Sequence, residues 1–326
     1  MSKRVWLTWE TQPRNKELAQ AFGCDYGHIV REGVGGVRRY IYGAVDTFVY
    51  LLKGRYQTLF VQCPSVVLCL LVSLYATVTR KVFVIDCHNI VLDQAGVGGV
   101  TRKVVSFIFR QADYVIVSNS ALVPRVKRLG GVPLVLPDKL PMVKGGSLPP
   151  AYSDCKAPLI TFVCSFASDE PIDEFISAAL LVEFDFTLFV TGKRSSAEKL
   201  GLLKYESDKV IFTDYLKKRD YDALIASSDI LVVLTTRDDC LVCGAYEALS
   251  ISTPAILSDT QVLRECFPSA FYYTKNTQED FQATLEVALG SEDYKNRKGR
   301  LEIDKLRFEE EWVKIFSEIN QEIEGV

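Results

Sequence analysis

The chain has 326 residues, of which 48% are hydrophobic and 24% are charged, and its formal net charge is −3. This length exceeds what one hydrophobic core normally organises, so we expect two domains of ordinary globular composition. The slightly acidic balance argues against a broad nucleic-acid-binding surface, and we predict no nucleic-acid partner.

The nine cysteines are odd in number and lie mostly in apolar runs, and the start Met-Ser-Lys-Arg-Val-Trp lacks the apolar stretch of a signal peptide. This usage predicts reduced thiols in a cytoplasmic protein. Cys240 and Cys243 form a C-x-x-C pair, but the only histidines, His28 and His88, are far away in the sequence. We therefore predict no metal site.

Short apolar runs alternate with helical patterns in the first half of the chain. Runs that are apolar on both faces and separated by helices predict a parallel sheet covered on both sides. The predicted strands are 5–8, 26–30, 58–62, 82–85, 114–117 and 134–136, and the predicted helices include 16–22, 37–52 and 101–110.

An uncharged stretch runs from residue 56 to residue 79 and is interrupted by Cys63-Pro64-Ser65. The part before the interruption predicts a buried strand. The part after it, near 66–78, is shorter than the roughly 20 residues that a membrane-spanning helix needs. We predict a strongly apolar helix there, with peripheral contact to the inner face of a membrane, or to a partner, as the alternative to a buried position.

The Gly-, Pro- and Ser-rich segment 146–158 predicts a linker between a first domain, 1–145, and a second, 159–304. The charged helical tail, 305–326, is expected to pack back on the first domain. After the linker the alternation restarts, with predicted strands at 159–164, 187–190, 210–212, 230–234, 255–257 and 271–273, and predicted helices at 172–182, 220–226, 243–249, 261–266 and 278–289. Two such arrays predict an α/β protein with two Rossmann-like doubly wound domains.

In open α/β sheets ligands bind beyond the carboxyl ends of the strands, so functional residues are expected there. The strand 230–234 is followed by a polar loop with Asp239 and then by a helix that carries Cys243, Gly244 and Glu247. A helix N-terminus offers free N–H groups to a diphosphate, and Gly244 would let a phosphate approach the backbone. A carboxylate on the first turns can accept hydrogen bonds from the two hydroxyls of a ribose.

This segment, D-C-L-V-C-G-A-Y-E-A-L-S-I-S-T-P-A, resembles the motif E-G-F-G-L-P-x-x-E-A-x-A-x-G-x-P-V of the retaining glycosyltransferase family four. The resemblance implies a GT-B fold, in which two Rossmann-like domains face a central cleft, and a nucleotide-sugar donor. Glu247 matches the glutamate that binds the nucleotide's ribose, and Asp239 matches the glutamate that contacts the donor sugar. The chain departs from the motif where Asp replaces this glutamate, Cys-Leu-Val replaces Gly-Phe-Gly and Ser-Thr-Pro replaces Gly-Thr-Pro. The wider layout resembles a bacterial polysaccharide-type branch.

Other strand ends of the second half also carry candidates. Gly192 is followed by Lys193 and Arg194, which suit a diphosphate. The turn after strand 159–164 offers Ser165 and Phe166 to the donor, but it lacks cations. Its acidic residues, Asp169 and Glu170, are predicted to cap the next helix. The resemblance implies that Thr213 and Tyr215 contact the base.

In the first half, His88 and Asn89 follow the strand 82–85, and the resemblance implies that a histidine here orients the donor sugar or the leaving phosphate. The alternative for His88 is a structural hydrogen bond. Glu10, at the end of the first strand, and Arg14, at the start of the next helix, are predicted to lie on the acceptor side, Arg14 as a phosphate contact.

These candidates predict a retaining, metal-independent glycosyltransferase with no cofactor, in which His88, Asp239 and Lys193 are catalytic. Adjacent Asp238 and Asp239 do not reproduce the D-x-D spacing that binds metal in the other large glycosyltransferase fold. The predicted donor is a UDP-, GDP- or ADP-sugar, and the predicted acceptor is a saccharide or lipid-linked saccharide of a bacterial surface polysaccharide or glycolipid. The alternatives are a non-catalytic glycosyltransferase-like subunit and another GT-B enzyme, such as a nucleotide-sugar epimerase.

Overall fold

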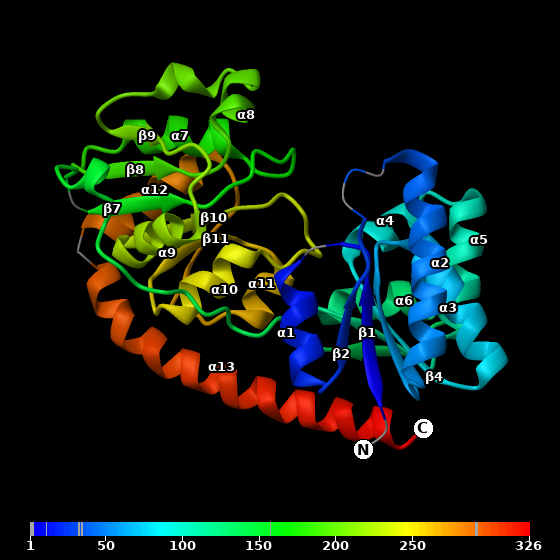
Figure 1. Ribbon diagram of the computed structural model, residues 1–326. Helices are drawn as coiled ribbons and strands as arrows, with labels where there is room; N and C mark the ends of the chain where they lie inside the picture. The colour runs from blue at the N-terminus through cyan, green and yellow to red at the C-terminus, as the bar shows by residue number, and fades with distance from the viewer. Residues whose placement is uncertain (1–2, 11, 32, 34, 157, 291–292) are drawn as a thin grey trace. The chain divides into compact units, whose positions relative to one another are not determined.

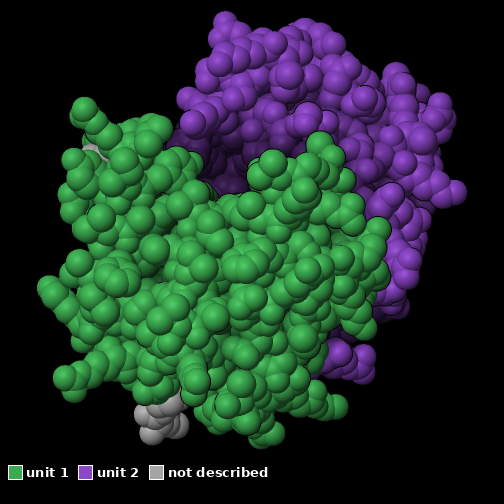
Figure 2. Space-filling model, turned by 90° about the vertical axis from the view of Figure 1, so that its right-hand side faces the viewer, with its two compact units in different colours: residues 1–139, 312–326 green, residues 140–311 purple. Residues whose placement is uncertain are grey.

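The computed structural model describes residues 3–10, 12–31, 33, 35–156, 158–290 and 293–326; residue 157 of the predicted linker lies outside them. The chain divides into two compact units, which Figure 2 colours separately. Unit 1 comprises residues 1–139 and 312–326, and unit 2 comprises residues 140–311. Each unit contains a six-stranded parallel sheet with helices, as Figure 1 shows, so the prediction of two Rossmann-like α/β domains is confirmed.

The sheet of unit 1 has the order β2-β1-β3-β4-β5-β6. Its four inner strands are almost entirely buried, because helices cover both faces, whereas the two edge strands are partly exposed. The strands are β1 (Arg4–Thr8), β2 (Asp25–His28), β3 (Thr58–Cys63), β4 (Val82–Cys87), β5 (Tyr114–Val117) and β6 (Pro133–Val135).

One face of this sheet packs against α2, α3 and α5, which contact one another in that order (Figure 1). On the other face Trp6 stacks on Phe60, and Phe22 packs against Phe316 from the end of α13. The short helices α4 and α6 were not predicted. The helices of unit 1 are α1 (Pro13–Ala21), α2 (Gly36–Gly54), α3 (Val66–Thr79), α4 (Asn89–Gly96), α5 (Gly99–Gln111) and α6 (Val123–Leu129), with the last turns of α13 (Asp293–Glu324).

The sheet of unit 2 has the order β12-β11-β10-β7-β8-β9, which is the strand order of the dinucleotide-binding Rossmann fold. Part of the predicted linker packs on this unit, where Leu148 and Tyr152 lie against Phe189. The strands are β7 (Leu159–Phe162), β8 (Thr187–Val190), β9 (Val210–Phe212), β10 (Ile230–Val233), β11 (Ala255–Ser258) and β12 (Tyr272–Thr274). The helices are α7 (Ile172–Leu181), α8 (Arg194–Lys199), α9 (Lys218–Ser227), α10 (Cys243–Ser250), α11 (Gln261–Cys266), α12 (Gln278–Gly290) and the first part of α13. Unit 2 also has 3-10 turns at Pro150–Tyr152 and Leu202–Tyr205, and unit 1 has one at Ser120–Leu122.

The strand orders define where each sheet reverses its winding. The reversal lies between β1 and β3 in unit 1 and between β7 and β10 in unit 2. At such a switch point the loops leave neighbouring strands in opposite directions and open a crevice at the carboxyl ends. The side chains at these two strand ends are therefore the first candidates for function.

Candidate functional site

The loops that follow β7 and β10 are joined at the switch point of unit 2. Thr235 donates its hydroxyl hydrogen bond to Asp169 Oδ2 (2.8 Å), and the N–H of Thr236 donates to the Asp169 carbonyl (2.7 Å). The predicted capping role of Asp169 and Glu170 is wrong, because the N-cap residue of α7 is Pro171, with no side-chain cap bond. The carboxylate of Asp169 instead holds the two loops together.

The carboxylate of Glu170 binds backward onto the loop after β7. It accepts hydrogen bonds from the N–H of Ser165 (3.0 Å), the N–H of Ala167 (2.9 Å) and the Ser165 hydroxyl (3.0 Å). Phe166, between these amides, has a φ of 63°. Burial raises the pKa of Glu170 although the hydrogen bonds from Ala167 and Ser165 oppose this shift. The predicted donor contacts Ser165 and Phe166 thus lie in a loop whose amides already hold an anion.

The loop after β8 packs tightly against this one. Gly192 has a φ of 105°, and a Cβ there would lie 2.7 Å from the Phe166 ring. Lys193 follows as the exposed N-cap residue of α8. The side chain of Arg194 pairs with Glu206, and its N–H donates to Asp214 Oδ1 (2.9 Å). Of the two predicted diphosphate cations, Arg194 is thus held by a carboxylate, whereas the Lys193 side chain is exposed to solvent.

The segment after β9 contains the two residues predicted to contact a base. Thr213 is buried and donates its hydroxyl hydrogen bond to the Asp214 carbonyl (3.0 Å), whereas 75% of the Tyr215 surface is exposed. Asp214 has a φ of 57°, and hydrogen bonds from the N–H groups of Arg194 and Tyr215 lower the pKa of its carboxyl. The loops after β8 and β9 are therefore joined by Asp214, and the side chain of Tyr215 is exposed to solvent.

The loop between β10 and α10 carries Asp239, whose Oδ1 lies 3.7 Å from an Arg237 nitrogen. Cys243 is the exposed first residue of α10. A Cβ on Gly244 would lie 2.8 Å from Val233 and 3.2 Å from Val163, both at the ends of the central strands. Glycine at this position therefore lets the start of α10 pack closely on the sheet, which brings its N-terminal amides to the switch point.

Glu247 lies one turn further along α10 and is half-buried. Tyr221, on α9, donates its hydroxyl hydrogen bond to Glu247 Oε2 (2.5 Å). Burial raises the pKa of Glu247, while the bond from Tyr221 and the charge of Lys218 act in the opposite direction. Tyr221 was not predicted from the sequence, because it lies 26 residues from Glu247 and only the packing of α9 beside α10 brings the two together.

In unit 1 the corresponding strand ends carry a network centred on Gln62, the penultimate residue of β3. Its Oε1 accepts from the Thr8 hydroxyl (2.5 Å), and its Nε2 donates to Gln12 Oε1 (2.6 Å). The same Nε2 lies 3.2 Å from Nε2 of His88, the N-cap residue of α4. His88 Nε2 also lies 3.7 Å from Asp86. Gln62 was not predicted, since a single amide inside an apolar strand has no sequence signature.

Arg14, which was predicted to contact phosphate, lies at a buried ion pair. Its guanidinium binds Asp86 (2.9 Å), Asp138 and the carbonyl of Leu136 (3.2 Å). Burial opposes the charge of Arg14, but the attraction of the two carboxylates overcomes this and raises its pKa. The side chain is 12% exposed. Its charge is therefore neutralised within unit 1 and positions Asp86 next to His88.

The other two acceptor-side candidates also follow strands of unit 1. Glu10 comes directly after β1, where its N–H donates to the Thr8 hydroxyl (3.0 Å). Asn89 is the first residue of α4, next to His88. Thr8 thus contacts both Glu10 and Gln62, and the strand ends of β1, β3 and β4 form one polar edge.

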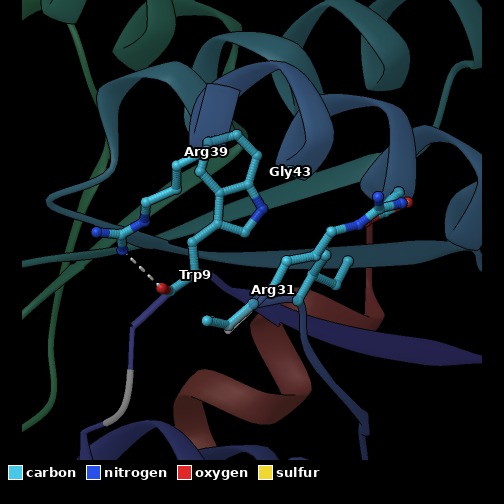
Figure 3. A pocket seen from close by; sticks show the side chains of 7 residues that line it. Trp9, Arg31, Arg39 and Gly43 are labelled. Carbon is cyan, nitrogen blue, oxygen red and sulfur yellow. Dashed lines mark hydrogen bonds and ion pairs between the residues drawn. The ribbon is translucent and has the colours of Figure 1, made fainter. Parts of the chain in front are cut away.

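Trp9 is the first residue after β1, and a small hollow lies beside its side chain (Figure 3). The indole N–H of Trp9 donates to Thr47 (3.0 Å), and Arg39 donates to the Trp9 carbonyl (3.1 Å). A Cβ on Gly43 would lie 2.9 Å from the indole ring. The hollow has room for about one water molecule, so it is too small for a sugar.

Comparisons with known proteins give one family match, in the second unit. Residues 152–300 match the family model "Glycosyl transferases group 1". This range contains the loops after β7, β8, β9 and β10, and therefore every candidate residue of unit 2. None of the curated protein sequences that were compared matches the chain.

Solved structures resemble the chain over nearly its whole length. Anabaena HepE in complex with UDP and glucose has a TM-score of 0.73 at 13% identity and covers 100% of both chains. Sucrose-phosphate synthase from Thermosynechococcus elongatus has a TM-score of 0.66 at 16% identity, with 91% of this chain and 82% of the other covered. A Rickettsia africae glycosyltransferase has a TM-score of 0.63 at 11% identity, with coverages of 99% and 90%. The fold of the chain is therefore GT-B.

Proposed function

We propose that this protein transfers a sugar from a nucleotide-diphosphate sugar to an acceptor hydroxyl. The match to the glycosyl transferases group 1 model and the GT-B fold support this activity. The observation that carries the proposal is Glu247, a half-buried carboxylate on α10 that Tyr221 holds next to the switch point of unit 2. A carboxylate held there can accept hydrogen bonds from a ribose. The structures of HepE with UDP and with UDP-glucose support UDP as the first donor base to test.

The roles of the other residues of unit 2 follow from their positions. The free N–H groups at the start of α10, with Cys243 and Gly244, and the exposed Lys193 would bind the diphosphate. Asp239 would contact the donor sugar, and Tyr215, with Thr213 behind it, would meet the base. Arg194 would act through Asp214, whose loop its N–H supports.

In unit 1 we assign His88 to the reacting sugar or the leaving phosphate, with Glu10 and Asn89 on the acceptor side. Gln62 and Asp86 position the imidazole, and Arg14 keeps Asp86 in place. We assign none of the described carboxylates as a covalent nucleophile, and we propose that the leaving group departs and the acceptor attacks on the same face, with retention. Backbone amides and Lys193 would stabilise the leaving diphosphate, and we propose that no metal takes part.

The rival function is a non-catalytic glycosyltransferase-like subunit. The loop after β7 favours it, because Ser165 to Glu170 contain no arginine or lysine and two adjacent acids, which oppose a diphosphate. Calorimetry with UDP, GDP, ADP and their sugars separates the two functions. We expect micromolar binding of one nucleotide and slow hydrolysis of its sugar; no binding of any nucleotide would favour the subunit.

Glu247→Ala tests the site itself. Losing hydrogen bonds from the ribose to a charged group should weaken nucleotide binding by about tenfold or more. Glu279→Ala, an exposed carboxylate on α12, is the matched control and should bind like the wild type. Equal affinities of the two variants would contradict the proposed role of Glu247.

We further propose that the acceptor is lipid-linked and that unit 1 docks on an anionic membrane through α2. No helix in the described part of the chain could span a membrane. The predicted docking helix near 66–78 is α3, and its face with Leu68, Val72 and Ala76 is buried in the core. The outward face of α2 is a better candidate, because a stripe of its apolar side chains, spaced three or four residues apart, is 45–74% exposed: Val37, Ile41, Val45, Phe48 and Leu52.

Charge complementarity favours a lipid surface over a protein as the occupant of this face. The neighbouring helices α2, α3 and α5 contain six basic residues and one acidic residue, Asp46, which pairs with Arg31. Exposed apolar side chains on helices with an excess of basic residues suit the boundary of an anionic bilayer. We expect the protein to sediment with vesicles of phosphatidylglycerol and phosphatidylcholine, less at high salt, and not with phosphatidylcholine alone.

Phe48→Glu should abolish this sedimentation. Val287→Glu, which changes a similarly exposed side chain (58%) on α12, should not. Sedimentation that is unchanged by Phe48→Glu would overturn the proposal, and so would a concentration-dependent dimer that this variant dissociates, since a second copy would then cover the face.

A further inference from the structure

The loop between β7 and α7 holds a group of backbone amides to which no role has yet been assigned. At the switch point of a sheet with the Rossmann strand order, this first loop is where backbone N–H groups face a phosphate. In this chain the N–H groups of Ser165 and Ala167 converge on one acceptor, the carboxylate of Glu170. Successive N–H groups around a residue in the left-handed region, here Phe166, form a concave anion site.

The site is built by neighbouring strand ends and not by the loop alone. Gly192 packs against Phe166 so closely that a Cβ would lie 2.7 Å from the ring and 2.9 Å from the Cys164 carbonyl. The N–H of Cys164 donates to Thr191 (3.1 Å), and Asp169 binds Thr235 on the other side. The backbone that presents the amides is therefore held from β8 and from β10, whereas Glu170 occupies them only through its side chain.

We propose that Glu170 is an intramolecular stand-in for the donor's diphosphate, which displaces its carboxylate from the Ser165 and Ala167 amides when the donor binds. This inference rests on the proposed function. A side chain can rotate away without moving the strands, and the vacated N–H groups then serve the phosphate oxygens. Glu170 thereby sets the threshold for donor binding: a weakly bound anion fails to displace it, whereas a diphosphate that is also held through its ribose at Glu247 succeeds.

The competition predicts that removing the carboxylate strengthens nucleotide binding. Glu170→Ala should bind UDP about fivefold to tenfold more tightly than the wild type, because a charged competitor for the same amides is gone and its repulsion is lifted. Glu170→Gln should fall between the two, since an amide oxygen still accepts but carries no charge. Glu174→Gln, which removes an exposed carboxylate from the first turn of α7, is the matched control and should change the affinity less than about twofold.

A second measurement follows the amides directly. Amide hydrogen exchange at Ser165 and Ala167 should be faster in Glu170→Ala than in the wild type, and saturating UDP should slow it in both proteins. Thermal unfolding verifies that the variants fold.

The outcomes separate the two proposals. If no variant binds UDP, GDP or ADP, the proposed function fails and the stand-in fails with it. If the wild type binds a nucleotide and Glu170→Ala binds it equally or more weakly, the stand-in is overturned while the proposed function survives. Unchanged exchange at Ser165 and Ala167 in Glu170→Ala would also overturn it.

Discussion

The two switch points of the molecule hold their polar side chains in different ways. In unit 1 the ends of β3 and β4 carry Gln62 and Asp86, and the first turn of α1 carries Arg14. All three are nearly buried and bind partners from distant parts of the chain. In unit 2 the ends of β7 and β10 carry Glu170 and Glu247, which are half-buried, Glu170 bonded within its own loop and Glu247 to one side chain. The first arrangement positions groups rigidly, and the second leaves carboxylates that a ligand can reach or replace.

The largest effect on stability is expected when the buried ion pair of unit 1 is broken. Asp86→Ala leaves Arg14 buried with only Asp138 as a charged partner, so the free energy of unfolding should fall by about 3–5 kcal/mol. Urea unfolding measures the loss. Asp46→Ala, which breaks the exposed pair with Arg31, should leave the stability of the same unit nearly unchanged. Similar losses for both variants would remove the contrast between the buried and the exposed pair.

The packing of the loops after β7 and β8 can be broken next. Gly192→Ala should destabilise the protein by about 1–3 kcal/mol, since the residue has a φ of 105° and its Cβ would clash with Phe166 and the Cys164 carbonyl. Nucleotide binding should weaken as well, because the amides of the loop after β7 shift. Gly201→Ala has a positive φ but no atom within 4 Å of its Cβ, so it serves as a control for conformational strain alone. Equal losses in thermal unfolding experiments would exclude the close packing as the cause.

A smaller effect is expected when Glu247 loses its partner. Tyr221→Phe keeps the packing of α9 but removes the hydrogen bond to the carboxylate, so nucleotide affinity should fall by about threefold to tenfold. Calorimetry with the nucleotide that the wild type binds measures the change. Tyr205→Phe, which removes a hydroxyl bonded to Ser177 elsewhere in unit 2, should bind normally. Normal binding by Tyr221→Phe would show that Glu247 needs no positioning.

The smallest effect is expected on the pH dependence of stability, through the half-buried Glu247 of unit 2. Burial raises the pKa of Glu247, so the folded protein binds this proton more tightly than the unfolded chain does. Protonated Glu247 therefore contributes to stability at low pH. This contribution is lost as the pH rises from the pKa of Glu247 in the unfolded chain through its pKa in the folded protein. Glu247→Gln should thus gain stability relative to the wild type as the pH rises above the ordinary glutamate pKa of about 4. A difference in urea unfolding that stays constant as the pH rises would contradict the assignment.

Much of the fold could be predicted from local patterns. Apolar runs such as Thr58 to Cys63 and Ile230 to Val233 predict strands of a parallel sheet that is covered on both faces, and both strands are buried. All twelve predicted strands are present. Helices α4, α6 and α8 were missed because eight, seven and six residues hold too few turns for a clear period. The positions of Glu247 and His88 next to strand ends could also be predicted, since a strand end is a local feature.

Their partners were decided by the tertiary structure alone. The sequence by itself determined that Glu170 is an acid in a short loop, but only the left-handed turn at Phe166, packed against Gly192, aims the Ser165 and Ala167 amides at its carboxylate. Likewise, the sequence shows only that Arg14 is basic. In the folded protein Asp86 of β4 and Asp138, after β6, neutralise the charge of its guanidinium. Secondary structure follows from residues that are neighbours along the chain. The charge and the availability of a side chain follow from residues that are neighbours only in space.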